Sequence, residues 1–369
     1  MYGQESADSW GAQILHHATR RRYRGIAIPL VVLTLLFTIW ICSDLVTGAI
    51  KQRPLSGFSF ADSNGSHQTH TEEQEINGPQ WATHNPKTNT GSLIPPKIWQ
   101  ILLPKKQTAD DVIIDPDTLR DTPSWLVMNP DYTYTLVGHD GGSEFVKQHF
   151  PDDPSLIEMY NNLPNVGMQS DFLRYLILDV EGGVYTDIDT VALKAIDKWV
   201  PTDLRDKVRL IVGVEFDRRD GGGWADIPHW LQFCQWTIAA APGHPIFRKM
   251  VTRIFQSLDD ISVSHGVPVN KLTPTSFEVM NSTGPAAWTD VVFEALQEHD
   301  SSLKTTKDLS FMTKPRLYGD ILVLTIDGFG MGQPHSHSTN DGSTPDAALM
   351  RHLFRGSWRG DSIEPDNGS

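Results

Sequence analysis

Residues 168–193 read MQSDFLRYLILDVEGGVYTDIDTVAL, and the architecture of the chain follows from this segment. Apolar residues recur in its first half at helical spacing. We expect that helix to end at Gly182-Gly183, where a left-handed backbone costs little. The three residues after the glycines read as a short strand. This strand delivers Asp187 and Asp189 at its C-terminal end, which is where open α/β sheets bind ligands.

The two carboxylates stand one residue apart. In an extended segment alternate side chains share a face, so Asp187 and Asp189 are expected to point to one place while Ile188 packs behind them. Two convergent carboxylates suit a hard divalent cation such as Mg²⁺ or Mn²⁺, which bridges them to a diphosphate. The D-x-D pattern is also common by chance, so the neighbouring residues must decide whether it is a metal site or a chance match.

The predicted helix carries a charged pair beside its apolar stripe. Asp171 and Arg174 are three residues apart and therefore share a face on which they can act together. The alternative is a surface ion pair, which contributes less than about 1 kcal/mol. The apolar stripe that we expect to be buried consists of Phe172, Leu173, Leu176, Ile177 and Val180.

Composition narrows the class of protein. The 369 residues carry a formal charge of −14 without a long basic run, which argues against a nucleic-acid partner. The first 92 residues do not look globular, which leaves one large domain at 93–360 and a C-terminal tail at 361–369. Cys42 lies in an apolar run and Cys234 is alone in this domain, so we expect Cys234 to pack as a small hydrophobe.

The N-terminal part predicts a membrane anchor. Residues 25–43 contain no charge and would span ~28 Å as a helix, close to the hydrocarbon thickness of a bilayer. Arginines crowd its N-terminal side, so the positive-inside bias keeps residues 1–24 cytoplasmic and sends the rest into the lumen. A cleaved signal peptide is the rival interpretation. Residues 44–92 are polar and read as a largely disordered lumenal stem, with Asn64 as a glycosylation candidate.

The rest of the domain alternates strand-like and helical patterns, which predicts an α/β fold. No GxGxxG or GKS/GKT phosphate loop is present. We interpret Gly141-Gly142 and Gly221–Gly223 as turns. Strands are expected at Ile98–Leu102, Tyr132–Val137, Leu210–Val214 and Ile321–Ile326, and helices near 168–179, 246–258 and 286–297.

Several separated motifs resemble the fungal initiation-specific α-1,6-mannosyltransferases, which are DxD-containing members of glycosyltransferase family 32. The resemblance runs from Ile94 to about Arg359 and rests on IPPKIWQ (94–100), SDFLRYLIL (170–178), GGVYTDIDT (182–190), QFCQWTIAAAPGHP (232–245), NSTGPAAWTD (281–290) and RHLFRGSW (351–358). It implies a GT-A-type, Rossmann-like nucleotide-sugar-binding domain in a single-pass type II Golgi membrane enzyme.

The resemblance also implies an activity. The expected enzyme is a retaining, Mn²⁺- or Mg²⁺-dependent transferase that moves mannose from GDP-mannose to a high-mannose N-glycan core, forms an α-1,6 linkage and initiates outer-chain mannosylation. Membership of a mannosyltransferase complex is a further expectation. Inositol-phosphoceramide is the alternative acceptor known in the family.

Site residues follow from the same motifs. Asp187 and Asp189 resemble the metal and diphosphate motif, with Asp189 the more direct ligand and Asp187 shared with the ribose or sugar of the donor. Asp171 and Arg174 match donor-sugar contacts, in which the carboxylate accepts sugar hydroxyls and the guanidinium holds a hydroxyl or a phosphate oxygen.

The C-terminal motif resembles a segment that closes over the diphosphate. It offers His352 as a metal ligand or a hydrogen-bond donor to the phosphate, and Ser357 and Trp358 as contacts to the sugar-nucleotide donor. A histidine that caps a helix end is the alternative for His352.

For several other residues the sequence allows either a binding role or a purely structural one. Trp99 and Gln100 follow the first strand, where a base or ribose contact competes with core packing. Glu215 and Asp290 are acceptor candidates or ordinary loop carboxylates. Asn281 and Thr283 belong to a second glycosylation sequon. Asn281 is a glycosylation candidate, but because the sequon lies inside a family motif, the alternative is that it lines the active site and stays unmodified.

Two rivals come from other classes. DIDTV at 187–191 also fits the DxDx[TV] pattern of haloacid-dehalogenase-type phosphatases, although those proteins carry it directly after their first strand. A non-catalytic subunit of a mannosyltransferase complex would retain the fold without turnover. The presence of Asp171, Arg174, Asp187 and Asp189 together argues against that subunit.

Overall fold

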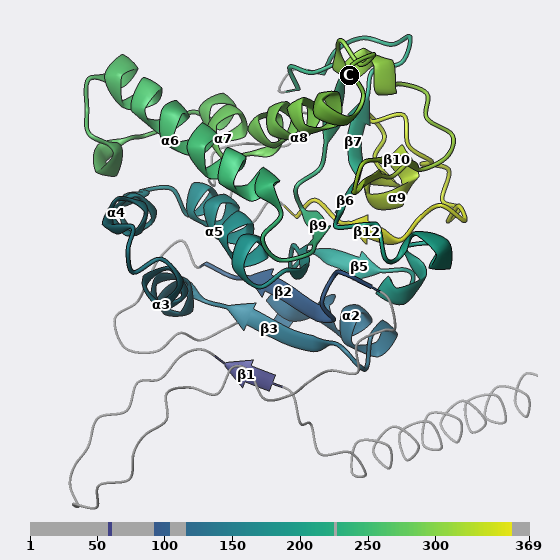
Figure 1. Cartoon of the computed structure of the whole chain (residues 1–369), viewed down its shortest axis with the longest axis horizontal. Helices are drawn as coiled ribbons and strands as arrows, with labels where there is room; N and C mark the ends of the chain where they lie inside the picture. Colours follow the sequence, from purple (N-terminus) through teal and green to yellow (C-terminus); the bar gives the residue numbers. More distant parts are fainter. Residues whose placement is uncertain (1–57, 61–91, 104–115, 225–226, 356–369) are drawn as a thin grey trace, which may run out of the picture. The chain divides into compact units, whose positions relative to one another are not determined.

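A computed structural model describes residues 58–60, 92–103, 116–224 and 227–355 (Figure 1). The predicted cytoplasmic tail at 1–24, the anchor at 25–43, the C-terminal tail at 361–369 and most of the stem lie outside these residues. Helices within them fail to combine the length and the apolar character that crossing a bilayer requires. Inside the predicted stem, Phe58–Phe60 form a strand, β1, which pairs with a strand of the domain.

A mixed sheet forms the centre of the domain, in the order β1-β3-β2-β4-β9-β6-β11-β10. The β1–β3, β3–β2, β2–β4 and β6–β11 pairs are parallel, whereas β9 runs antiparallel to both β4 and β6, and β10 runs antiparallel to β11. Its further strands are β2 (Lys97–Ile101), β3 (Thr133–Val137), β4 (Gly183–Thr186), β6 (Leu210–Val212), β9 (Thr237–Ala240), β10 (Arg316–Tyr318) and β11 (Ile321–Val323).

Two antiparallel ribbons stand beside the sheet. One joins β5 (Thr190–Ala192) to β12 (Met350–His352), and the other joins β7 (Val214–Asp217) to β8 (Leu231–Phe233). The predicted strand at Leu210–Val214 therefore divides at Gly213, where an added Cβ would lie 2.6 Å from the Phe329 side chain. The predicted strand at Ile321–Ile326 is shorter than expected, because Ile326 already begins a helix.

Helices cover both faces of the sheet. They are α2 (Thr122–Met128), α3 (His139–His149), α4 (Pro154–Asn162), α5 (Val166–Val180), α6 (Pro245–His265), α7 (Ser276–Ser282), α8 (Pro285–His299) and α9 (Ile326–Gly330). The helices predicted near 168, 246 and 286 correspond to α5, α6 and α8. Figure 1 shows α5, α6, α7 and α8 gathered together.

Strand alternation separates two apolar cores. Trp99, Tyr185 and Ile238 face the core beneath α3 to α8, whereas their neighbours Ile98, Val184 and Ala239 face the core beneath α2, α9 and the β5–β12 ribbon. Cys234 is fully buried, as predicted. The sheet is therefore covered on both faces, as in an α/β protein.

The turn prediction for Gly141-Gly142 is wrong, since both glycines lie inside α3. A Cβ on Gly142 would lie 2.5 Å from the Tyr160 hydroxyl and 2.8 Å from Leu173 Cδ2. The glycine thus serves close helix packing, which local turn statistics do not capture.

The Gly182-Gly183 turn joins α5 to β4 as predicted, with φ of +62° and +99°. A Cβ on Gly183 would lie 2.7 Å from the Lys97 carbonyl oxygen of β2. We expect Gly183→Ala to lower the free energy of unfolding by about 2 to 3 kcal/mol through backbone strain and overlap. Urea unfolding measures this loss. Gly222→Ala is the control, because nothing lies within 4 Å of a Cβ at Gly222, and equal stability of the two variants would contradict the prediction.

Candidate active site

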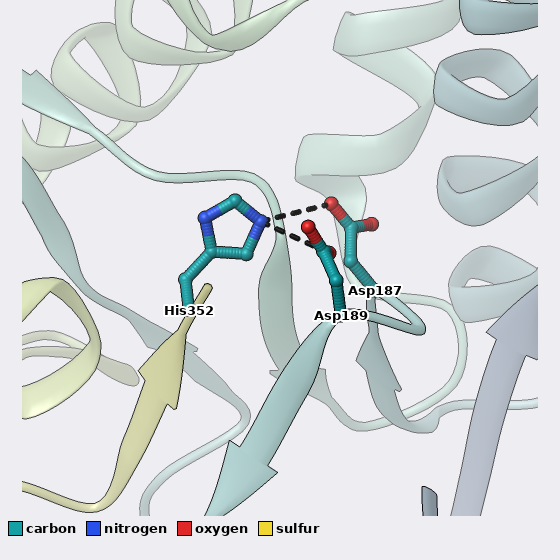
Figure 2. A group of neighbouring side chains, drawn as sticks. All are labelled: Asp187, Asp189 and His352. Atoms are coloured by element: carbon teal, nitrogen blue, oxygen red, sulfur yellow. Dashed lines mark ion pairs between the residues drawn. The ribbon is translucent and has the colours of Figure 1, made fainter. Parts of the chain in front are cut away.

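Asp187 and Asp189 follow β4 in a turn that leads into β5. The expected extended segment is wrong, because β4 ends at Thr186 and residues 188–189 form a turn before Thr190. Figure 2 shows that the carboxylates nevertheless lie side by side. Ile188 is buried in the core behind them, as expected. The turn, not strand alternation, brings the two acids together.

The backbone of Asp187 is fixed from three sides. Its amide donates to the Trp236 carbonyl at 2.8 Å, and its carbonyl accepts from Gln100 Nε2 at 3.0 Å and from the Thr190 hydroxyl at 2.5 Å. Gln100 is in turn held by hydroxyl donors from Thr122 and Tyr134 at 2.7 and 2.8 Å. Gln100 therefore positions the turn from inside the protein.

His352 completes the cluster from the far end of the sequence. It is the last residue of β12 and pairs with Thr190 of β5, so the helix-end alternative for this histidine is wrong. Its Nε2 lies 3.1 Å from Asp189 Oδ1 and 3.8 Å from Asp187 Oδ2 (Figure 2).

Aromatic rings hold the His352 imidazole. Trp236 stacks on it with a centroid distance of 4.7 Å and an interplanar angle of 6°, while Phe354 meets it edge-on at 4.0 Å. The Trp236 indole donates to the Phe329 carbonyl at 3.0 Å, which fixes this ring as well. The imidazole is thus oriented before any ligand arrives.

Each carboxylate has one oxygen held by the protein and one that faces His352. Asp187 Oδ1 accepts from the Tyr185 hydroxyl at 2.5 Å and from Arg174 at 3.3 Å. Asp189 Oδ2 accepts from the Arg355 amide at 2.9 Å. Asp187 Oδ2, Asp189 Oδ1 and His352 Nε2 therefore converge on one point.

These three groups fit a divalent cation. Their donor atoms lie within 4.8 Å of one another, and within the described part of the chain this is the His/Cys/Asp/Glu cluster suited to a metal. Neighbouring ligands of an octahedral ion with bonds of about 2.1 Å are about 3 Å apart, near the separation of His352 from Asp189. Carboxylate oxygens suit hard divalent cations, and the imidazole Nε2 adds a third donor on the same side of the site.

Asp171 and Arg174 lie under the cluster. Both side chains are buried, so the surface-ion-pair alternative is wrong. Arg174 Nη2 lies 2.9 Å from Asp171 Oδ1, and Nη1 lies 3.3 Å from Asp187 Oδ1. The guanidinium also stacks 4.5 Å above the Tyr185 ring. In this structure Arg174 joins the two acids, and a donor-sugar contact for this pair stays a prediction.

The two metal-facing acids differ in pKa. Burial raises the pKa of the Asp187 carboxyl above its ordinary value, although the Arg174 charge opposes this. Burial also acts on Asp189, but the His352 hydrogen bond and charge and the Arg355 amide outweigh it, so the pKa of Asp189 is lowered. Asp189 is therefore the acid that keeps its negative charge more readily.

Trp99 belongs to the core. Its indole donates to the Gly182 carbonyl at 2.9 Å and its ring is buried, which supports the packing interpretation. Ser357, Trp358 and Asn64 lie outside the described residues. Asn281 lies in α7, where its amide donates to the Phe277 carbonyl at 2.8 Å.

Glu215 and Asp290 are linked through two side chains. Gln232 Nε2 donates to Glu215 Oε2 at 3.1 Å, and Gln232 Oε1 lies 3.3 Å from His229 Nδ1. His229 Nε2 lies 2.8 Å from Asp290 Oδ1. Glu215 is buried, whereas the Asp290 side chain is 47% exposed. Their acceptor role stays a prediction.

The environment of Asp290 leads us to expect that the free energy of unfolding depends on pH in the acidic range. Burial alone would raise the pKa of its carboxyl, but hydrogen bonds and charges from His229 and Arg253 lower it overall. A lowered folded-state pKa stabilises the protein above the unfolded pKa of about 3.9, and this contribution is lost as the pH falls toward the folded pKa. Between about pH 5 and about pH 3, the melting temperature of the wild type should fall more steeply than that of Asp290→Asn. Parallel melting curves for the two proteins would refute this.

Sequence reasoning missed three residues of the site. Tyr185 was assigned only to a strand, although it stands two residues before Asp187 and the period of a strand could have placed both on one side. Trp236 and Gln235 come from a distant segment, after β8. Only the QFCQWTIAAAPGHP motif (232–245) pointed to that segment.

An α/β domain with paired carboxylates at the C-terminal end of a sheet strand fits a DXD-type glycosyltransferase domain. A family model described as "Glycosyltransferase sugar-binding region containing DXD motif" matches residues 117–206. The chain belongs to the glycosyltransferase family of the initiation-specific α-1,6-mannosyltransferases. Its mixed sheet with helices on both faces is an α/β fold, as expected.

Three relatives illustrate this membership. The chain is 35% identical over 274 residues to the initiation-specific alpha-1,6-mannosyltransferase of Schizosaccharomyces pombe, covering 73% of this chain and 64% of that protein. It is 31% identical over 296 residues to the Candida albicans protein of the same name, covering 73% of each. It is 26% identical over 160 residues to the mannosyl phosphorylinositol ceramide synthase CSH1 of Saccharomyces cerevisiae, covering 43% of this chain and 33% of that protein. The chain thus spans less than two thirds of the Schizosaccharomyces pombe relative.

Proposed function

We propose that this protein transfers mannose from GDP-mannose to a high-mannose N-glycan and forms an α-1,6 linkage in a Mn²⁺-dependent reaction that retains the anomeric configuration. The observation that carries the proposal is the convergence of Asp187 Oδ2, Asp189 Oδ1 and His352 Nε2. The relatives named α-1,6-mannosyltransferases support the choice of sugar and linkage. We also propose that the protein resides in the Golgi, with residues 25–43 as a type II membrane anchor. Membership of a mannosyltransferase complex is a further proposal, which co-purification from membranes would test.

Asp187, Asp189 and His352 would hold the metal. The bound ion would supply Lewis-acid stabilisation of the departing diphosphate. The protein contributes two carboxylate charges and a fixed imidazole, while Tyr185 and Arg174 hold Asp187 Oδ1 so that Oδ2 keeps its direction. This preorganisation lowers the cost of binding the charged donor.

Transfer would proceed on one face of the sugar. The bond between the anomeric carbon and the phosphate oxygen breaks as the acceptor hydroxyl oxygen bonds to that carbon, and the hydroxyl proton passes to the departing phosphate oxygen. This route needs no carboxylate nucleophile. A two-step route would require one beneath the anomeric carbon.

The proposal is tested with the purified full chain, Mn²⁺, a panel of sugar nucleotides and two acceptors. We expect GDP-mannose to be consumed with the high-mannose glycan, and NMR of the product to show an α-1,6-linked mannose. Omission of metal should abolish product. Transfer from another donor only, or release of inorganic phosphate as expected of a dehalogenase-type phosphatase, would overturn the assignment.

A lipid acceptor is the second candidate, because one relative is named a mannosyl phosphorylinositol ceramide synthase. That match covers less of the chain than the α-1,6-mannosyltransferase matches do. Inositol-phosphoceramide in detergent therefore serves as the second acceptor of the assay. Mannosylation of this lipid without glycan transfer would replace the N-glycan proposal.

A further inference from the structure

Thr283 reaches the site from the end of α7. Its side chain is fully buried, and its hydroxyl donates to Asp171 Oδ2 at 2.9 Å. Gln235 Nε2 donates to Asp171 Oδ1 at 3.0 Å. Both oxygens of this buried carboxylate are therefore oriented by neutral donors from segments that follow it by 112 and 64 residues.

Arg174 carries this orientation to Asp187. Asp171 Oδ1 binds one arm of the guanidinium at 2.9 Å, and the other arm contacts Asp187 Oδ1 at 3.3 Å and the Gln235 carbonyl at 3.1 Å. The guanidinium is planar and rigid, so fixing one edge fixes the other. A displacement of Asp171 would therefore displace the hydrogen-bond donor that aims Asp187.

Tyr175 ties the two neutral donors together. Its hydroxyl contacts Gln235 Oε1 and also lies 3.1 Å from the Thr283 carbonyl oxygen. Tyr175, Gln235 and Thr283 form one buried hydrogen-bond network, and this network fixes the position of the Asp171 carboxylate. Groups that hydrogen-bond a metal ligand directly typically change metal affinity 10- to 100-fold when they are replaced. Thr283 and Gln235 act on Asp187 through Asp171 and Arg174, so we expect an effect at the lower end of this range.

We propose that Thr283 and Gln235 are positioning residues that tune the metal affinity of the site through Asp171, Arg174 and Asp187. This inference rests on the proposed function, because it requires Asp187 to serve the metal. The inference gives the Asn281-Ser282-Thr283 sequence a structural role. The Thr283 hydroxyl, which would complete a glycosylation sequon, instead donates a hydrogen bond to the Asp171 carboxylate.

The test measures Mn²⁺ binding to the full chain by calorimetry in the presence of GDP, with the melting temperature recorded alongside. Thr283→Val should raise the Mn²⁺ dissociation constant about tenfold, whereas Thr283→Ser, which keeps the hydroxyl, should stay within about twofold of the wild type. Gln235→Met removes the other donor and should weaken binding similarly. If Thr283→Val does not fold, the Mn²⁺ dissociation constant of Gln235→Met alone tests the inference.

Two controls separate positioning from other effects. Thr289→Val removes another buried hydroxyl, one that bonds the Pro285 carbonyl and the Phe233 amide, and should lower the melting temperature without changing the Mn²⁺ dissociation constant. Asn281→Gln removes the sequon and the hydrogen bond from Asn281 to the Phe277 carbonyl, neither of which involves Asp171, and should bind Mn²⁺ as the wild type does.

Wild-type affinity in Thr283→Val or Gln235→Met, or an equal loss in Thr289→Val, would overturn the inference while the proposed function stands. Failure of the wild type itself to bind Mn²⁺ would overturn both.

Discussion

Asp189→Asn is expected to lower mannosyl transfer about a thousandfold while the protein remains folded, and Asp187→Asn is expected to do the same. The loss corresponds to ~4 kcal/mol of stabilisation of the departing diphosphate. Asparagine keeps the shape of the side chain but removes the charge that a divalent ion requires. Product formation from GDP-mannose at saturating Mn²⁺ measures the effect.

Asp259→Asn is the control for both variants, since Asp259 is an exposed carboxylate in α6. It should transfer mannose at the wild-type rate. The melting temperature of Asp189→Asn should stay near that of the wild type. Turnover within about tenfold of the wild type in either site variant would remove the replaced acid from the mechanism and contradict the paired-carboxylate assignment.

Arg174→Met is expected to produce the largest loss of stability. Its removal leaves the buried Asp171 carboxylate and the partly exposed Asp187 carboxylate without their shared cation. Breaking a buried ion pair such as Asp171–Arg174 costs about 3–5 kcal/mol. Arg174→Lys should recover only part of the loss, because a single ammonium cannot bridge both acids as the planar guanidinium does. Urea unfolding monitored by circular dichroism provides the measurement.

The comparison for Arg174→Met is Lys249→Met. Lys249 pairs with Glu294 and Glu298 on α8; the lysine is partly exposed and both glutamates are largely exposed to solvent. Such pairs contribute about 0–1 kcal/mol. Equal unfolding free energies for the Arg174 and Lys249 variants would show that the buried network does not support the fold.

The sequence correctly predicted those helices, strands and turns that are encoded by a few neighbouring residues. The stripe from Phe172 to Val180 and the glycine turn gave α5 and β4, because helical periodicity and positive-φ turns are encoded within a few residues. Burial of Asp171 and Arg174 was not predictable in this way. It depends on Gln235 and Thr283, which reach the pair only after the chain has folded.

Several features depend on packing between distant segments. The Gly141-Gly142 pair suggested a turn, yet Tyr160 and Leu173 require the absence of a side chain inside α3. Alternation suggested an extended DxD segment, whereas the contacts of Asp187 with Trp236 and Gln100 fix a turn. His352 could be placed beside the acids through the family resemblance alone, since its pairing with β5 joins two segments that are distant in the sequence.

The metal assignment is decided by a crystal of the full chain grown with Mn²⁺ and GDP and measured at wavelengths on both sides of the manganese absorption edge. We predict one anomalous peak about 2.0–2.5 Å from Asp189 Oδ1 and His352 Nε2, with the GDP diphosphate as a further ligand and Asp187 Oδ2 facing the ion. An anomalous peak elsewhere, or bound GDP with both carboxylates turned away from its phosphates, would contradict the account.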